Sequence, residues 1–547
     1  MPDRKKPRKR STKVAGPVSL APCYILLAAV ILFFGLIRFR LRDIPLERDE
    51  GEYAYAGQLL LEGVPPYTLA YSMKLPGTYV AYALIMAMFG QTPAGIHLGF
   101  LIVSSATTAL VFFLARRIFD ATAGVVAAAS YALLVTSPYV LGLAGHATHF
   151  VVLATLAGTV LLLKAIQSSR IWTFFWSGLL FGLAFLMKQP GIFFVVFAGA
   201  YLIKSQWEPE VSGRELRVRA AMFCWGSVLP FALTCLWLWR AGAFGRFWFW
   251  TSTYARQYGT IQSLADARSA FWDSVPPVIG SALPIWIVAT VGLISIFWNR
   301  RNANAIFFAA AFSVCSFLAV CPGFYFRGHY FILMLPAVSL FAGAAVSFTS
   351  KKLADRVKLR SFRFVPIFVF VIAYGYVISQ QWDYWFEMDA IAACRLVYGT
   401  NPFPEAVQIA DYLKTNASPS ASIAVVGSEP EIYFYSRHHS ATGYIYTYPL
   451  MEQQPYALTM QREMISEIEK ARPEFLVYVN SAFSWLRKPG SPNLIFDWTQ
   501  LYVANGYELV GVVDTLDEET QYRWGGDAKG YSPRTPNHVK IFKRTSS

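Results

Sequence analysis

Charged side chains are scarce in this chain of 547 residues, of which only 15% are Asp, Glu, Lys or Arg. An ordinary soluble domain carries roughly a quarter. Because 55% of the residues are hydrophobic and 16% are aromatic, the composition excludes a disordered, collagenous or low-complexity chain, and also a single soluble domain. The mean hydropathy of +0.39 instead predicts a membrane protein with room for one soluble domain.

Cysteines and nucleotide-binding motifs are also sparse. The chain has six cysteines, most of them in or beside apolar runs, and their spacing suggests neither a zinc site nor a disulfide framework. No Gly-x-Gly-x-x-Gly or Walker-type sequence follows a predicted strand, so nucleotide binding is not indicated. The net charge of +15 would suggest a nucleic-acid partner for a soluble protein. In a membrane protein it is first a signal of topology.

Apolar runs long enough to cross a bilayer, roughly 17–25 residues, fill most of the first 380 positions. They lie near 20–38, 96–115, 122–142, 148–166, 220–240, 275–298, 304–321, 329–349 and 363–380. The stretch 171–204 is interrupted at Lys188-Gln189-Pro190-Gly191 and is interpreted as two shorter spans, which gives about eleven crossings. The run 77–90 is too short to cross and is expected to be interfacial or re-entrant. The aromatic segment 242–258 predicts an amphipathic interfacial helix, which could shape a lipid-binding groove or lie on the bilayer.

Lysine and arginine indicate the orientation. If the basic tail before the first span is cytoplasmic, every predicted inner loop is basic. These positions are Arg116-Arg117, Lys164 with Arg170, Lys204 with Arg214–Arg219, Arg300-Arg301 and the cluster Lys351–Arg363. This positive-inside pattern accounts for most of the excess charge without nucleic acid. It predicts a multi-pass protein of the inner (plasma) membrane, with its first span kept as an uncleaved anchor.

The expected domains follow from this topology and from a change of composition after residue 380. A basic cytoplasmic tail covers 1–18, a transmembrane domain covers 19–380 with an outer loop at 39–95, and an extracytoplasmic domain covers 381–547. In the last of these, short buried strands alternate with helices, which is typical of a small α/β domain. The predicted fold class is therefore a polytopic α-helical membrane protein with a C-terminal soluble α/β domain.

The first outer loop holds an acidic cluster, Asp49, Glu50 and Glu52, shortly after the first span. A carboxylate at the membrane surface could act as a general base toward a hydroxyl or amine acceptor. The alternative is that Asp49 caps a helix that starts at Glu50, with acids at its positive end. The two roles are compatible.

Two histidines, His146 and His149, lie in a short outer loop between spans. At this spacing they could contact a metal or a phosphate from one face of a helix. Because no carboxylate sits beside them in the sequence, we favour hydrogen-bonded interfacial histidines and predict no metal site.

Two cations lie at other outer positions. Lys188 stands at the break between two apolar runs, where a lysine is costly unless it reaches water or an anion. Arg327 is surrounded by aromatic residues, and a guanidinium at headgroup level suits bidentate phosphate recognition. The alternatives are a lysine that snorkels to the interface and an arginine that anchors in an aromatic belt. Outer-face acids and cations together favour an anionic lipid substrate at the non-cytoplasmic leaflet.

Several motifs resemble a known family. Asp49-Glu50, Gly63-x-Pro-Pro-Tyr67 and Lys74-Leu-Pro-Gly77 resemble the first-loop signature of GT-C glycosyltransferases. The branch they resemble is the bacterial one related to protein O-mannosyltransferases (glycosyltransferase family 39) and to the lipid A aminoarabinose transferase. Lys188-Gln-Pro190, Arg327-x-His329-Tyr330 and Gly427-Ser-Glu-Pro-Glu431 are similar to that branch too. The resemblance therefore runs along nearly the whole chain, and it is not specific for donor or acceptor.

The resemblance implies a GT-C-type catalytic domain that transfers a sugar, with inversion, from a polyprenyl-phosphate donor in the outer leaflet. It implies no cofactor and at most a weak need for a divalent metal. Asp49 would deprotonate or orient the acceptor with Glu50 as its partner. Lys188 and Arg327, with Lys74 as a further candidate, would stabilise charge on the departing phosphate. The donor or acceptor pocket is expected to include Glu52, Tyr55, His146, His149, His329 and Tyr330. Some relatives carry an acid where this chain has its histidine pair, which leaves open whether His149 replaces that acid.

Two other functions stay open. A transporter or flippase for a lipid-linked or small solute would need charges at mid-membrane depth and repeated broken helices, whereas the charges singled out lie at span ends. A non-catalytic module would use its outer domain to bind glycan or protein. The expected partners are a polyprenyl-phosphate sugar donor, a lipid, glycan or protein acceptor, and membrane lipids, with no nucleic acid.

Overall fold

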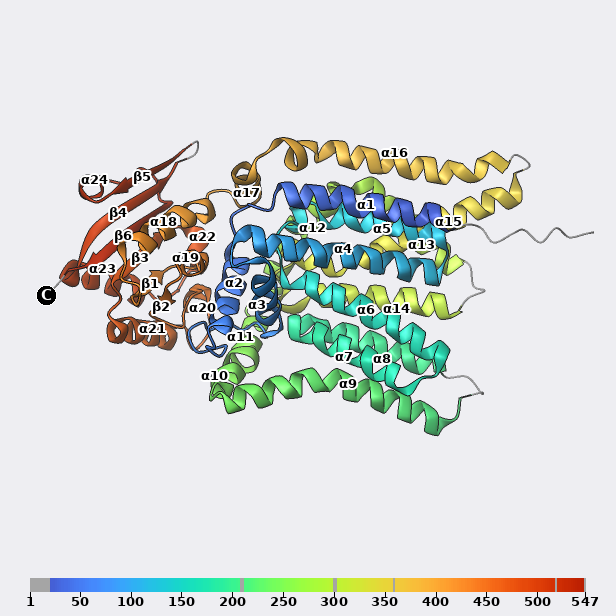
Figure 1. Ribbon diagram of the computed structural model, residues 1–547, viewed down its shortest axis with the longest axis horizontal. Helices are drawn as coiled ribbons and strands as arrows, with labels where there is room; N and C mark the ends of the chain where they lie inside the picture. Colours follow the sequence, from blue (N-terminus) through green and yellow to red (C-terminus); the bar gives the residue numbers. More distant parts are fainter. Residues whose placement is uncertain (1–19, 207–210, 299–302, 358–359, 517–518, 546–547) are drawn as a thin grey trace, which may run out of the picture.

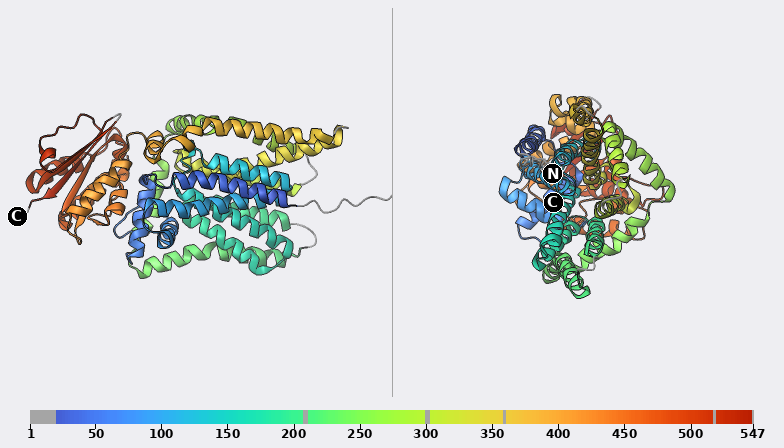
Figure 2. Two further views of the ribbon diagram at one scale, coloured as in Figure 1. Left: turned by 45° about the horizontal axis from the view of Figure 1, so that its top comes forward. Right: turned by 90° about the vertical axis from the view of Figure 1, so that its right-hand side faces the viewer.

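The chain folds into a bundle of long helices with a smaller sheet domain at one end (Figure 1). The computed structural model describes residues 20–206, 211–298, 303–357, 360–516 and 519–545. The basic tail 1–18, the pair Arg300-Arg301 and Lys358 lie outside the described residues. Turned about its long axis, the molecule keeps the same two parts, and the end-on view looks down the bundle (Figure 2).

Apolar helices run side by side along the long axis of the bundle (Figure 1). They are α1 (Ala21–Arg40), α4 (Pro93–Ile118), α5 (Ala121–Val135), α6 (Ala147–Ser168), α7 (Ile171–Met187), α8 (Ile192–Gln206), α9 (Gly213–Arg240), α13 (Leu283–Trp298), α14 (Ala303–Val320), α15 (Leu335–Arg356) and α16 (Val365–Gln380). Among the described residues, six helical segments are long and apolar enough to span a membrane, or seven with the bent pair α12 (Leu264–Gly280) and α13. The chain is thus a multi-pass membrane protein. The count of about eleven also included α5, α7, α8 and α15, which do not meet that length and hydropathy standard.

Close helix packing in the bundle depends on small residues. A Cβ added at Gly178 of α7 would lie 2.1 Å from the carbonyl oxygen of Phe223 in α9. A Cβ at Gly226 of α9 would lie 2.1 Å from the carbonyl oxygen of Phe175 in α7. Glycine at both positions lets the two backbones approach, which is a usual device of membrane helices.

Several predicted boundaries are corrected. The helix expected over 122–142 ends at Val135, the one over 275–298 is bent by 95° between α12 and α13, and the one over 329–349 begins at Leu335. A 3₁₀ turn, Gly328–Leu333, precedes it. The segment 242–258 is not one helix: it forms α10 (Phe244–Trp248), a π-helical turn (Phe249–Tyr254) and α11 (Ala255–Thr260).

Two short helices of the first outer loop, α2 (Arg48–Leu61) and α3 (Gly77–Phe89), lie where the bundle meets the sheet domain (Figure 1). The expectation that Asp49 caps a helix starting at Glu50 is wrong. Glu47 is the cap, and its carboxylate accepts a 2.9 Å hydrogen bond from the backbone N–H of Glu50. The Asp49 side chain is therefore not used as the helix cap.

The C-terminal domain contains a six-stranded mixed sheet of order β2-β1-β3-β6-β4-β5. Its strands are β1 (Ser422–Val426), β2 (His439–Ser440), β3 (Phe475–Asn480), β4 (Tyr507–Thr515), β5 (Thr520–Trp524) and β6 (His538–Arg544). β1 pairs in parallel with β2 and β3, and the remaining pairs are antiparallel. The helices of this part are α17 (Ala390–Tyr398), α18 (Phe403–Asn416), α19 (Glu431–Ser436), α20 (Tyr448–Met451), α21 (Ala457–Ala471), α22 (Ala482–Trp485), α23 (Leu494–Gly506) and α24 (Gly526–Lys529). The prediction of a C-terminal α/β domain is confirmed.

Candidate active site

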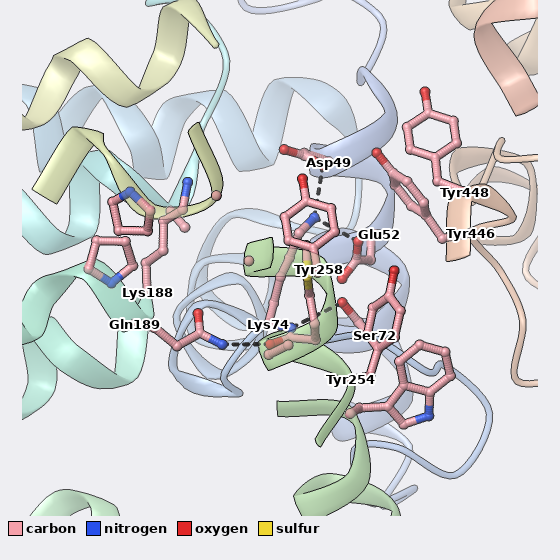
Figure 3. Close-up of a pocket in the computed structure, with 18 of the residues that line it drawn as sticks. Asp49, Glu52, Ser72, Lys74, Lys188, Gln189, Tyr254, Tyr258, Tyr446 and Tyr448 are labelled. Carbon is pink, nitrogen blue, oxygen red and sulfur yellow. Dashed lines mark hydrogen bonds and ion pairs between the residues drawn. The ribbon is translucent and has the colours of Figure 1, made fainter. Parts of the chain in front are cut away.

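A pocket lies where the helical bundle, the first outer loop and the C-terminal domain meet (Figure 3). Its walls come from the first outer loop, the turn between α7 and α8, the segment 250–259, the segment 319–330 and the segment 446–452. Seven of the residues predicted from the sequence line it: Asp49, Glu52, Lys74, Lys188, Arg327, His329 and Tyr330. The fold therefore gathers into one pocket groups that are up to 281 positions apart (residues 49 and 330) in the sequence.

Asp49, Glu52 and Lys74 form a compact ionic group in this pocket (Figure 3). The Lys74 ammonium lies 2.8 Å from Asp49 Oδ1 and 2.7 Å from Glu52 Oε2. The Tyr79 hydroxyl donates a 2.8 Å hydrogen bond to the other oxygen of Glu52. Two carboxylates thus already neutralise Lys74, which leaves it less suited to bind a phosphate than the sequence suggested.

The charge state of Asp49 follows from its neighbours. Burial alone would raise the pKa of Asp49, but Lys74, His329 and His146 together hold it well below the usual value. Burial would lower the pKa of Lys74, and the two carboxylates raise it well above the usual value instead. Asp49 is therefore an anion at neutral pH, and a lysine fixes its orientation.

Lys188 and Arg327 are cations of a different kind, because neither forms an ion pair with a carboxylate in the part of the chain that the structure describes. Lys188 Nζ lies 3.9 Å from the ring centroid of Tyr330, and the Arg327 guanidinium lies 5.6 Å from that of Tyr325. Burial lowers the pKa of Lys188 to about 7, against the opposing effect of Asp49. Two half-buried cations without a carboxylate partner favour the binding of an anion in this pocket.

Two imidazoles lie against the other side of Asp49. The rings of His146 and His329 stack with centroids 4.1 Å apart. Asp49 Oδ2 lies 3.8 Å from His146 Nδ1 and 3.9 Å from His329 Nε2. No carboxylate lies beside His146 in the sequence. In the fold, however, Asp49 from another segment lies next to it.

These three residues could hold a metal ion. One ligand atom from each of Asp49, His146 and His329 lies within 4.8 Å of the others. Burial lowers the pKa of His146 to about 4, so the imidazole is neutral, as a metal ligand must be. Neither of its ring nitrogens has a hydrogen-bond partner. The donor set suits zinc, although Asp49 already has a positive partner in Lys74.

Glu50, Tyr55 and His149, also predicted as site residues, lie outside this pocket. Glu50 Oε1 accepts a 2.6 Å hydrogen bond from the backbone N–H of Gly145 and lies 3.2 Å from His97 Nε2. The Tyr55 hydroxyl accepts a hydrogen bond from the backbone of the C-terminal domain. His149 packs edge-on against an aromatic ring. Each of the three ties α2 or α6 to its surroundings, which supports a structural role.

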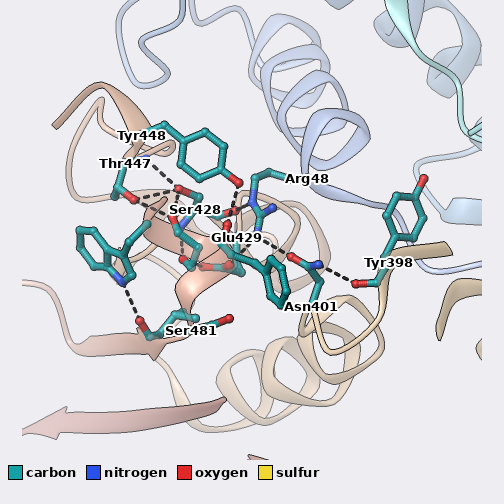
Figure 4. Close-up of polar contacts among 12 residues, drawn as sticks. Arg48, Tyr398, Asn401, Ser428, Glu429, Thr447, Tyr448 and Ser481 are labelled. Atoms are coloured by element: carbon teal, nitrogen blue, oxygen red, sulfur yellow. Dashed lines mark hydrogen bonds and ion pairs between the residues drawn. The ribbon is translucent and has the colours of Figure 1, made fainter. Parts of the chain in front are cut away.

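A buried clamp joins α2 to the C-terminal domain (Figure 4). Arg48 Nε donates a 2.5 Å hydrogen bond to the carbonyl oxygen of Ser428, and its Nη2 lies 3.0 Å from Glu429 Oε1 and 3.1 Å from Asn401 Oδ1. The other oxygen of Glu429 accepts a hydrogen bond from Ser484. Because Arg48 precedes Asp49 in the chain, this clamp fixes the position of the pocket carboxylate relative to the sheet domain.

The sequence missed the pocket residues from the segments 250–259 and 446–452. They include Trp250, Tyr254, Tyr258, Tyr446 and Glu452. The aromatic content of 242–258 is a signal for the first group, and the sequence leaves open whether this interfacial segment shapes a lipid-binding groove or lies on the bilayer. No local pattern marks the second group, because only the docking of the C-terminal domain brings it to the pocket.

Comparison with known proteins agrees with this geometry. Residues 74–239 match the family described as dolichyl-phosphate-mannose-protein mannosyltransferase. The undecaprenyl phosphate-alpha-4-amino-4-deoxy-L-arabinose arabinosyl transferase of Pseudomonas aeruginosa (strain UCBPP-PA14) is 26% identical over 276 residues, 48% of each chain. The aligned part thus spans about half the length of that curated relative.

Solved structures show the same fold over nearly the whole chain. ArnT from Cupriavidus metallidurans bound to undecaprenyl phosphate superposes with a TM-score of 0.59 at 17% identity, covering 96% of this chain and 98% of that one. The apo oligosaccharyltransferase of Archaeoglobus fulgidus has a TM-score of 0.51 at 12% identity, covering 95% and 76%. Residues 74–239 thus match the dolichyl-phosphate-mannose-protein mannosyltransferase family, and the chain as a whole has the same fold as ArnT from Cupriavidus metallidurans.

Proposed function

We propose that this protein transfers a sugar from a polyprenyl-phosphate donor to an acceptor, with inversion, at the outer face of the membrane. The observation that carries the proposal is the pairing, in one pocket, of an ionised Asp49 with two cations that have no carboxylate partner, Lys188 and Arg327. The donor class is supported by the related ArnT structure, which is bound to undecaprenyl phosphate, and by the lipid-phosphate sugars named for the family and for the Pseudomonas relative.

In the proposed reaction the donor phosphate binds between Lys188 and Arg327, and its sugar extends toward Asp49. The acceptor oxygen or nitrogen attacks the anomeric carbon from the face opposite the phosphate, so the configuration inverts. Its proton passes to Asp49, and the polyprenyl phosphate leaves with its negative charge stabilised by the two fixed cations. Lys74 keeps Asp49 oriented and ionised. A carboxylate of low pKa is a weak base. Asp49 would therefore orient the acceptor first, and would accept its proton only as the bond between the anomeric carbon and the phosphate breaks.

The same proposal includes the topology. The basic inner loops support a cytoplasmic N-terminus and an extracytoplasmic pocket. The membrane domain 19–380 would then cross about eleven times, and the domain 381–547 would cover the pocket from outside. Cysteine labelling with an impermeant reagent at an exposed position of the C-terminal domain, in intact cells, tests this orientation.

The activity can be tested with the purified full-length protein in nanodiscs, a panel of radiolabelled undecaprenyl-phosphate sugars and a cell-envelope extract as the acceptor. Asp49→Asn should lower the transfer rate at least about 100-fold, the range for loss of a positioned proton acceptor. The exposed Asp497→Asn on α23 is the matched control and should keep the parent rate. Equal rates for Asp49→Asn and the parent would contradict the mechanism. The coupling constant of the product's anomeric proton reports inversion.

A transporter or flippase is the alternative that the same preparation distinguishes. Its signature would be movement of the lipid-linked sugar between leaflets of proteoliposomes without any new glycosidic bond. The pocket argues against it, because its charges gather at helix ends beneath a folded domain and not at mid-span depth.

A further inference from the structure

The C-terminal domain supplies one wall of the pocket. Tyr446, Tyr448, Pro449 and Glu452 all line it, and they come from the segment between β2 and α21. We refer to residues 446–452 as the roof. In Figure 3 the Tyr446 and Tyr448 side chains lie on the side of the pocket near Asp49 and Glu52. The roof therefore faces the groups to which the chemistry has been assigned.

Glu452 is an acid that the proposed transfer does not use. Its carboxylate accepts a hydrogen bond from the hydroxyl of Tyr254, in the π-helical turn Phe249–Tyr254. It forms no ion pair with a cation anywhere in the described ranges. Burial raises its pKa, and Arg327 acts in the opposite direction. One oxygen of this carboxylate is thus engaged by Tyr254, and the group still has acceptor capacity toward the pocket.

Aromatic rings line the same pocket as this carboxyl group. Trp250 and Tyr254 pack edge to face with centroids 5.1 Å apart, and Tyr258 stacks on Tyr325 at 4.6 Å. Such rings offer an apolar face with a polar tip. The C–H faces of a sugar ring pack against aromatic faces, while its hydroxyls donate hydrogen bonds to a carboxyl group. A pocket wall that combines aromatic side chains with a carboxylate that accepts hydrogen bonds is therefore suited to bind a sugar.

The place of Glu452 relative to the phosphate-binding cations fits a sugar attached to the phosphate. Glu452 lines the same pocket as Arg327 and Asp49. A sugar attached to a phosphate that Arg327 holds would therefore lie in the pocket that both carboxylates line.

The roof is held firmly enough to be selective. The Arg48 guanidinium lies 5.5 Å from the ring centroid of Tyr448, and the Lys74 ammonium lies 5.5 Å from that of Tyr446. These are cation–π distances, and they add to the buried Arg48–Glu429 clamp (Figure 4). A wall fixed in this way loses little freedom when a ligand binds, which favours specificity.

We propose that Glu452 and the roof tyrosines form a sugar-binding subsite, in which Glu452 accepts hydrogen bonds from sugar hydroxyls and selects the sugar. The inference rests on the proposed function. The shared chemistry is a hydroxyl-rich sugar ring, which could belong to the lipid-phosphate donor or to a glycan acceptor.

The test uses the full-length protein in nanodiscs and compares two measurements. The first is the affinity for undecaprenyl phosphate against that for the undecaprenyl-phosphate sugar, from the panel above, that the parent turns over fastest. The second is the KM for the acceptor in a cell-envelope extract. Glu452→Ala should leave the affinity for undecaprenyl phosphate unchanged and weaken binding of the sugar-bearing form about 10- to 100-fold, as expected for lost hydrogen bonds to a charged group. Glu452→Gln, which keeps an oxygen acceptor, should recover part of this loss.

The outcomes separate the two proposals. Loss of sugar-dependent donor affinity supports a donor subsite, and a raised acceptor KM with unchanged donor affinity supports an acceptor subsite. If Glu452→Ala changes neither quantity while the parent transfers sugar, the subsite is refuted and the transferase is not. If the parent neither binds undecaprenyl phosphate nor transfers sugar, the proposed function itself fails. Glu508→Gln, on an exposed pair with Lys529, is the control and should match the parent.

Discussion

Binding of the donor phosphate should weaken as the pH rises, because Lys188 then loses its positive charge. Burial, reinforced by Lys74 and Arg327 and opposed by Asp49, lowers the pKa of Lys188 from the ordinary 10.5 to about 7. A phosphate beside the ammonium favours its charged form and raises that pKa again. Because the pKa is lower without the phosphate than with it, the contribution of Lys188 is complete below pH 7 and declines as the pH rises above it.

The magnitude follows from the protonated fraction. With a pKa of about 7, the charged fraction of Lys188 falls from roughly a quarter at pH 7.5 to about one hundredth at pH 9. At pH 9, Lys188 has to take up a proton each time the phosphate binds. The Kd should therefore rise about 20-fold between pH 7.5 and pH 9, which corresponds to ~1.8 kcal/mol of binding free energy. The neighbours should not titrate in this range. Burial keeps His146 and His329 neutral, and the carboxylates keep Lys74 charged.

The assay is a Kd for undecaprenyl phosphate, measured by isothermal titration with the protein in nanodiscs at several pH values from 7.5 to 9. Above pH 7.5 the phosphate monoester is already a dianion, since its second pKa is about 6, so the ligand does not contribute to the slope. Lys188→Arg should bind with little pH dependence because a guanidinium stays charged. A Kd of the parent that is as flat as that of Lys188→Arg would refute this reasoning.

Three further predictions concern stability and metal. Arg48→Met should destabilise the docked C-terminal domain by about 3–5 kcal/mol, since it leaves Glu429 buried without its partner, and limited proteolysis or thermal unfolding should report the loss. Gly51→Ala should cost about 1–3 kcal/mol, because the new Cβ would lie 2.7 Å from the backbone nitrogen of residue 431, whereas Gly35→Ala meets nothing within 4 Å and should unfold like the parent. Chelation with EDTA should leave the transfer rate unchanged, because a lysine already balances the pocket aspartate; a loss of transfer on chelation that added zinc restores would contradict this expectation.

The sequence was most informative where local chemistry decides the structure. Apolar runs predicted the long helices, and short buried strands between helices predicted the C-terminal α/β domain. Lys188 and Arg327 could be singled out because an isolated charge at a span end needs a reason wherever it occurs. The family resemblance, which the match over residues 74–239 supports, implied a role for Asp49 that composition alone does not supply.

What the sequence could not show depends on tertiary contacts. Glu50 looks equivalent to Asp49 in the chain, but successive positions on a helix point in different directions, and Glu50 binds the backbone at Gly145 instead. Lys74 looks like a free cation until two carboxylates are seen beside it. Glu452 carries no local signal, since it reaches the pocket only through the docking of a domain that is about 400 positions from the first loop.

The dispersal of the pocket walls along the chain has a consequence for biosynthesis. The carboxylate belongs to residue 49, whereas the roof belongs to residues 446–452, so every helix of the bundle is synthesised before the last wall. During membrane insertion the nascent chain therefore has the aspartate and both cations but no surface against which to hold a sugar. In the proposed topology, a chain whose C-terminal domain fails to cross the membrane would stay in that incomplete state. Correct membrane insertion would then be a condition for a closed pocket.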